Sequence, residues 1–144
     1  MTGKQPKRKP RPGVDSYGRT PLHYASSNGD VAAVRQLLAA GANPNASDDD
    51  GRTPLHFATQ ESRVDVVLTL LDAGANVDPA DSNGNTPLSN AVFKSNGEGS
   101  IITVLRERGA DPKRQNLHGV SPLSLARTIA NFDVAQFFKD LPSE

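Results

Sequence analysis

Two histidines are the first residues in this sequence that could carry out acid–base chemistry. His23 and His56 each follow a threonine by three residues, in the segments GRTPLHYA (18–25) and GRTPLHFA (51–58). An imidazole beside a hydroxyl group is typical of nucleophilic catalysis, which also requires a third group that orients the base. Both histidines, however, occupy the same position of a duplicated segment, whereas a catalytic residue is normally unique. We therefore interpret them as structural residues.

An acidic run, Asp48 to Asp50, could be taken for part of a calcium-binding loop. An EF-hand loop needs oxygen ligands at positions 1, 3, 5 and 12. If Asp48 and Asp50 are positions 3 and 5, Ala46 and Phe57 fall at positions 1 and 12, and neither side chain can coordinate a cation. A loop that starts at Asp48 places Arg52 at position 5. We therefore predict no metal site and interpret the run as an acidic turn.

Other catalytic and cofactor-binding signatures are also missing from the sequence. The chain contains no cysteine, which excludes disulfide bonds, thiolate–metal sites and cysteine nucleophiles. The glycine-rich segment at 95–99 lacks the Gly-Lys-Ser/Thr sequence of a phosphate-binding loop. Since no unique set of nucleophile, acid–base group or metal ligand is present, we predict that the protein is not an enzyme and uses no cofactor.

The histidines belong to a repeat with a period of about 33 residues. The segments GRTPLHYA, GRTPLHFA, GNTPLSNA and GVSPLSLA begin at residues 18, 51, 84 and 119. A Gly-Ala pair follows in the first three units and begins at residues 41, 74 and 109. A period of this length is typical of an array in which each unit stacks on the next to bury its apolar face. The third unit is two residues longer than the first two, and we place these two additional residues near 95–99.

Each unit is predicted to form two short helices. A Thr or Ser N-cap followed by proline begins the first helix, as at Thr53 and Pro54. Apolar residues at helical spacing, such as Val67 and Leu71, predict a second helix with one buried face. The glycine of the closing Gly-Ala pair, such as Gly74, can adopt the left-handed conformation that ends a helix.

With these motifs the chain resembles the ankyrin-repeat family. The pattern D-x-x-G-x-T-P-L-H-x-A, with L-L-x-x-G-A in the second helix, recurs from residue 15 to about residue 141. The resemblance implies an all-α repeat fold, an ankyrin solenoid of stacked helix-turn-helix units with β-turn or hairpin loops. It also implies that His23 and His56 tie the start of a helix to the backbone of a neighbouring turn. The chain departs from the pattern at Ser89 and Ser124, which replace histidine, and at Arg106, which replaces leucine.

We expect a single ankyrin-repeat domain over residues 15–141, with repeats at about 15–47, 48–80, 81–114 and 115–141. Residues 1–14 contain five basic residues, three prolines and no acidic residue, and predict a basic disordered tail. A nuclear-import signal and a nucleic-acid-binding arm are the alternatives for this tail, but the absence of interleaved aromatic residues argues against nucleic-acid binding. The rest of the chain holds 11 basic and 16 acidic residues and is therefore mildly acidic.

Nothing in the sequence indicates a membrane protein. No apolar run approaches the roughly 20 residues that span a bilayer, and the N-terminus lacks the apolar segment of a secretory signal. We expect a soluble, cytoplasmic protein that is monomeric when free.

The resemblance further implies that the turn tips and the first helices form a concave face that binds another protein. Aromatic and arginine side chains dominate the binding energy of protein interfaces, so they are our main candidates for partner binding. The predicted partner-binding residues are Tyr17, Arg19, Asp49, Asp50, Arg52, Asn83, Asn85, Phe93, Lys94, Leu117 and His118.

Two functions are consistent with such a face. The first is a compact inhibitor of one partner protein, similar to small stand-alone ankyrin proteins that act as immunity proteins against toxins. The second is an adaptor, scaffold or regulatory ankyrin protein in a larger assembly. The short length and the acidic repeat region favour the inhibitor.

Overall fold

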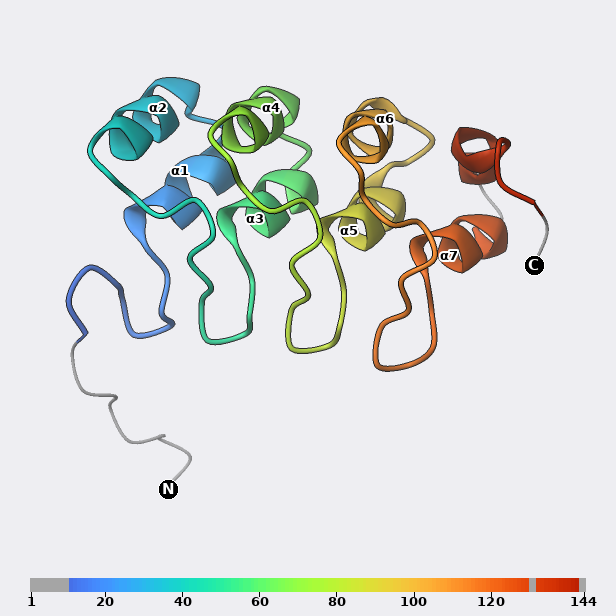
Figure 1. The fold of residues 1–144 in the computed structure, drawn as a ribbon, viewed down its shortest axis with the longest axis horizontal. Coiled ribbons are helices and arrows are strands. Elements are labelled where there is room, and N and C mark those ends of the chain that lie inside the picture. Colours follow the sequence, from blue (N-terminus) through green and yellow to red (C-terminus); the bar gives the residue numbers. More distant parts are fainter. Residues whose placement is uncertain (1–10, 130–131, 143–144) are drawn as a thin grey trace.

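The computed structural model describes residues 11–129 and 132–142. Within these residues the chain forms seven α-helices, one 3₁₀ helix and no β-strand. The helices are α1 (Pro21–Asn28), α2 (Val31–Ala39), α3 (Pro54–Gln60), α4 (Val64–Asp72), α5 (Pro87–Lys94), α6 (Ser100–Glu107), α7 (Pro122–Thr128) and the 3₁₀ helix η1 (Val134–Phe138). Figure 1 shows α1, α3, α5 and α7 in one row, α2, α4 and α6 in a second row above it, and the long turns below. The predicted all-α repeat fold is confirmed.

Each helix of the first row begins at a proline that follows a capping hydroxyl. Thr53 has an extended backbone, with φ −97° and ψ 168°, and its side chain accepts the N–H of His56. Such a cap satisfies an N–H of the first turn that has no partner within the helix. The equivalent caps are Thr20, Thr86 and Ser121. The helix starts predicted from the sequence are therefore confirmed.

Glycines close the helices and shape the turns. Gly74 follows α4 with φ 90°, the left-handed conformation that glycine adopts without a steric penalty. Gly84, in a turn tip, has φ 80° and also lies against the next unit. A Cβ atom there would lie 2.9 Å from the backbone nitrogen of Leu117, so any larger residue would push neighbouring turns apart.

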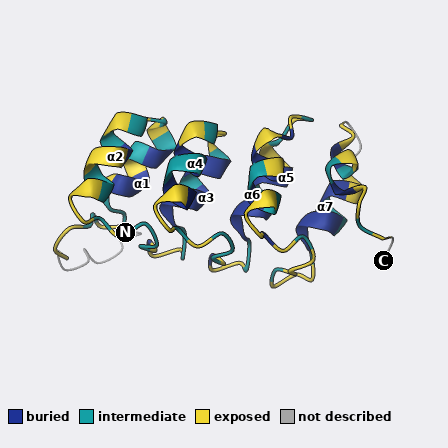
Figure 2. Cartoon of the chain, turned by 45° about the horizontal axis from the view of Figure 1, so that its top comes forward, coloured by how far each residue is buried: buried dark blue, intermediate teal, exposed yellow. Residues whose placement is uncertain are grey.

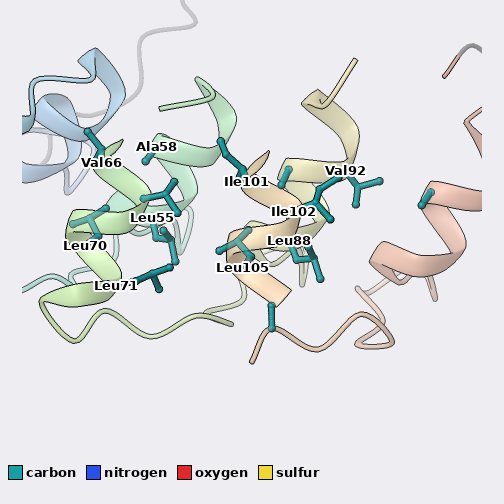
Figure 3. Packing of buried hydrophobic residues seen from close by; sticks show 14 of the residues in the cluster. Leu55, Ala58, Val66, Leu70, Leu71, Leu88, Val92, Ile101, Ile102 and Leu105 are labelled. Atoms are coloured by element: carbon teal, nitrogen blue, oxygen red, sulfur yellow. The ribbon is translucent and has the colours of Figure 1, made fainter. Parts of the chain in front are cut away.

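The hydrophobic core runs along the row between the two layers of helices. Leu55 and Leu88, from the first row, are fully buried, as are Leu70 and Leu105 from the second row. Figure 3 shows how these side chains point into the space between layers. In Figure 2 the buried residues lie mainly in the helices, while most residues of the turns are exposed or intermediate. Each unit thus buries its apolar residues between its own two helices and against the neighbouring units, as the repeat period predicts.

The fourth unit differs from the others, as its sequence indicates. Its second helix is the 3₁₀ helix η1, whose Phe138 is buried. The Arg106 guanidinium lies 5.2 Å from the centre of the Phe138 ring, and Arg106 Nη1 donates to the carbonyl oxygen of Phe137 at 2.9 Å. Arg106 also makes two hydrogen bonds to the Asp140 carboxylate, at 2.7 and 2.8 Å. The arginine that replaces a leucine in the third unit therefore holds the fourth unit in place.

The predicted basic tail falls largely outside the described part of the chain. Residues 1–10 are not among the described residues, and residues 12–13 form a turn. Arg11 makes two hydrogen bonds to the Asp49 carboxylate, at 2.9 and 3.1 Å. The end of the predicted tail is thus in contact with the acidic turn of the second unit.

Candidate binding surface

The four turn tips share one hydrogen-bond arrangement. Asp48 Oδ1 accepts the backbone N–H groups of Asp50 and Arg52, each at 2.9 Å. Two bonds to one oxygen fix the path of the turn and with it the direction of the side chains that it carries. The residues that do the same in the other units are Asp15, Asp81 and Asn116.

Backbone hydrogen bonds also join each tip to the next. The N–H of Asp49 donates to the carbonyl of Tyr17 at 2.9 Å, and the N–H of Leu117 donates to the carbonyl of Asn83 at 3.0 Å. A third bond, from the N–H of Ser82 to the carbonyl of Asp50, measures 2.8 Å. The tips and the adjoining helices α1, α3, α5 and α7 therefore form one continuous surface, which we call the tip face (Figure 1).

His23 and His56 connect neighbouring units beneath the tip face. His56 Nδ1 accepts the N–H of Thr53 at 3.1 Å, and Nε2 donates to the carbonyl oxygen of Asn85 in the next unit at 3.0 Å. His23 makes the matching pair of bonds, at 3.0 and 2.9 Å. Since Nδ1 accepts a backbone N–H, the neutral ring carries its proton on Nε2. The structural interpretation of both histidines is confirmed.

Both imidazole rings are held in the neutral form. His23 and His56 are completely buried, and burial lowers the pKa of each below the ordinary histidine value of 6.5. Burial has this direction because it disfavours the charged imidazolium. Each ring therefore acts as a neutral connector between units at neutral pH.

The third unit lacks this connector. Ser89 takes the histidine position, and its backbone N–H donates to Thr86 Oγ1 at 3.4 Å. Its short side chain does not span the gap to Val120, whose carbonyl corresponds in the repeat to that of Asn85. Ser124, at the same position of the fourth unit, instead accepts the N–H of its own cap residue at 2.9 Å.

A pocket of about 500 Å³ lies on the tip face next to Ser89. It brings together five of the residues predicted to bind a partner, namely Arg52, Asn85, Phe93, Lys94 and His118. The other lining residues are Ser89, Asn90, Leu125, Asn116 and Asp81, together with Gln60 and Val120. The replacement of histidine by Ser89 is the sequence signal that could have indicated this pocket.

Tyr17 and Arg19 form a second group, at the first tip. Tyr17 is 61% exposed, and the Arg19 guanidinium lies 5.0 Å from the centre of its ring. The same guanidinium lies 5.2 Å from the centre of the Phe57 ring. Arg19 Nε is also 3.4 Å from Asp48 Oδ2. This arginine thus lies close to two aromatic rings and a buried carboxylate.

The remaining predicted residues lie along the tips and outside the pocket. Asp50, Asn83 and Leu117 are exposed, and Leu117 is 76% exposed although it is a large apolar residue. Asp49 forms the ion pair with Arg11. The partner-binding role of these residues stays a prediction.

The comparison with protein families agrees with the repeat pattern. The family description "Ankyrin repeats (3 copies)" matches residues 6–81 and 30–116 of the chain. Among the described residues, no helix is long and apolar enough to cross a membrane.

Proposed function

Since the chain belongs to the ankyrin-repeat family, whose repeats are protein–protein interaction modules, we propose that it binds a partner protein along the tip face. The observation that carries this proposal is the exposure of aromatic side chains on a surface fixed by backbone hydrogen bonds. Tyr17 is 61% exposed and Phe93 is 68% exposed. Large exposed aromatic side chains contribute strongly to interface energy.

The proposed partner is inhibited by this interaction. The tip face is continuous from the first to the fourth unit. A partner that binds along it therefore has an extended part of its own surface covered. We propose that the chain acts as a cytoplasmic monomer before it meets this partner.

A triple variant tests the binding face. We expect Tyr17→Ala, Arg52→Ala and Phe93→Ala together to abolish capture of the partner from the native cell, because truncating interface hot spots commonly costs 2 kcal/mol or more each. All three side chains are partly or well exposed, so the thermal stability should change little. Capture is measured by affinity purification and quantitative mass spectrometry.

A matched control carries substitutions of exposed residues on the second row of helices, Arg35→Ala, Gln36→Ala and Thr103→Ala. This control should retain the partner as the unchanged chain does. Equal retention of the partner by both variants would place the binding surface elsewhere. Inhibition is then tested by adding the chain to the purified partner in equimolar amounts; an unchanged partner activity would favour the adaptor role.

A further inference from the structure

The pocket beside Ser89 includes the place that a histidine ring fills in the preceding units. The His23 ring meets the Phe57 ring edge-on, with centroids 5.2 Å apart, and bonds to the carbonyl of Arg52. The residues that correspond to Phe57 and Arg52 in the fourth unit are Leu125 and Val120. Both line the pocket together with Ser89. The surroundings of an imidazole are therefore present, while the imidazole itself is missing.

The carbonyl oxygen of Val120 has a free acceptor position. The carbonyl of Asn85 accepts two hydrogen bonds, from the N–H of Asp81 at 2.9 Å and from His56 Nε2 at 3.0 Å. The carbonyl of Val120 accepts the N–H of Asn116 at 2.8 Å and, in the described part of the chain, no second donor. A carbonyl oxygen has two lone pairs, so this one can accept a further N–H or O–H.

The walls of the pocket suit a ring. Phe93 and Leu125 supply apolar surface, and Phe93 is 68% exposed on this face. Asn90 and Lys94 supply polar groups. Pockets that combine apolar walls with a few placed polar groups bind ligands that have both characters. Tryptophan, tyrosine and histidine side chains have an aromatic ring and a hydrogen-bond donor, and tryptophan and tyrosine are common interface anchors.

We propose that this pocket receives a donor-bearing aromatic side chain of the partner protein, which takes the place of the histidine missing at position 89. The ring packs against Leu125 and Phe93, and its N–H or O–H donates to the carbonyl oxygen of Val120. The inference rests on the proposed function, because it specifies what the partner presents to one part of the tip face.

Small aromatic probes test the pocket without the partner. Indole carries both the ring and the N–H donor, whereas 1-methylindole has the ring but no donor. In nuclear magnetic resonance titrations of the full chain, indole should shift the signals of Val120 and Leu125 with a dissociation constant on the order of 1 mM. The value for 1-methylindole should be weaker by about fivefold, since one hydrogen bond is lost. Equal binding of both probes would refute the donor's role.

Two variants locate the binding. In Ser89→His the new ring should fill the pocket and donate a hydrogen bond to the Val120 carbonyl. The melting temperature should then rise by about 3 °C. Indole binding should be abolished. Phe93→Ala should weaken indole binding, whereas Tyr17→Ala, which removes another well-exposed aromatic residue at the first tip, should leave indole binding unchanged. If Ser89→His does not fold, the Phe93 and Tyr17 variants still decide the location.

The inference is overturned if indole causes no shift at Val120 or Leu125, or if Phe93→Ala and Tyr17→Ala bind indole equally. Such a result would leave the proposed function intact, because partner capture by the triple variant is measured separately. Loss of the proposed function would be seen as partner binding that does not depend on the tip face, whatever indole does.

Discussion

At the scale of single residues, the two histidines show how one side chain can serve two units. His56 joins Thr53 at the start of its own helix to the carbonyl of Asn85 in the next unit. The arrangement requires a neutral ring, because Nδ1 must accept a hydrogen bond while Nε2 donates one. Protonation would turn Nδ1 into a donor that faces a backbone N–H. These contacts therefore depend on pH.

We expect acid to weaken the fold through these rings. Their pKa values are lower in the folded chain than in the unfolded chain, so the unfolded state binds more protons as the pH falls below about 6.5. Their contribution to stability is present above that pH and is lost as the pH falls through the window below it. The free energy of unfolding, measured by urea denaturation and circular dichroism, should thus be lower at pH 5.5 than at pH 7.5.

A comparison of two variants assigns this effect to the buried rings. His56→Gln should reduce the histidine-linked pH dependence by about half, because one of two buried rings is removed. His118→Gln removes an exposed histidine at a turn tip and should leave the dependence unchanged. An equal effect of both substitutions would contradict the assignment.

At the scale of elements, the third and fourth units are joined by residues that depart from the repeat pattern. Arg106 takes the place of a leucine and binds Phe137, Phe138 and Asp140 instead of filling the core. The glycine-rich insertion before α6 lies against the fourth unit. Gly99 is so close to the Phe137 ring that a Cβ atom at this position would overlap it. The insertion therefore contributes to the contact between the last two units.

Gly99→Ala tests this contact. Gly99 has φ −105°, which alanine adopts readily, so any loss of stability comes from the clash with Phe137. We expect a destabilisation of about 1–3 kcal/mol, as for an overpacked core position. Thermal and urea unfolding measure it, with Thr103→Ala, an exposed substitution within α6, as the control that changes stability by less than about 0.5 kcal/mol. A Gly99→Ala variant as stable as the control would show that Phe137 does not restrict this position.

At the scale of the whole molecule, the fold is a row of units whose stability depends on nearest neighbours. The core is continuous along the row, and it includes the buried Val34 near one end and the buried Phe138 near the other. Removal of apolar volume at one end should therefore destabilise mainly the units at that end. In this part of the array the η1 region packs against α7.

Phe138→Ala should destabilise this end of the array. Truncation of a buried phenylalanine costs about 3–5 kcal/mol, a large part of the 5–15 kcal/mol of a typical domain. In hydrogen exchange, amides of α6 and α7 should lose protection, whereas those of α1 to α4 should retain most of theirs. Uniform loss of protection from α1 to α7 would show instead that the array unfolds as one cooperative unit.

The sequence by itself determined the repeat, the helix starts and the structural role of the histidines. Thr53, Pro54 and Gly74 act through backbone conformation and hydrogen bonds within a few residues, and local rules of this kind can be applied without a structure. Only the tertiary structure decided which contacts are made by the residues that depart from the repeat pattern. The pocket beside Ser89 is lined by residues of three units, which no local pattern brings together. Arg106 and Arg11 likewise find partners 34 and 38 residues away along the chain, which no local pattern specifies.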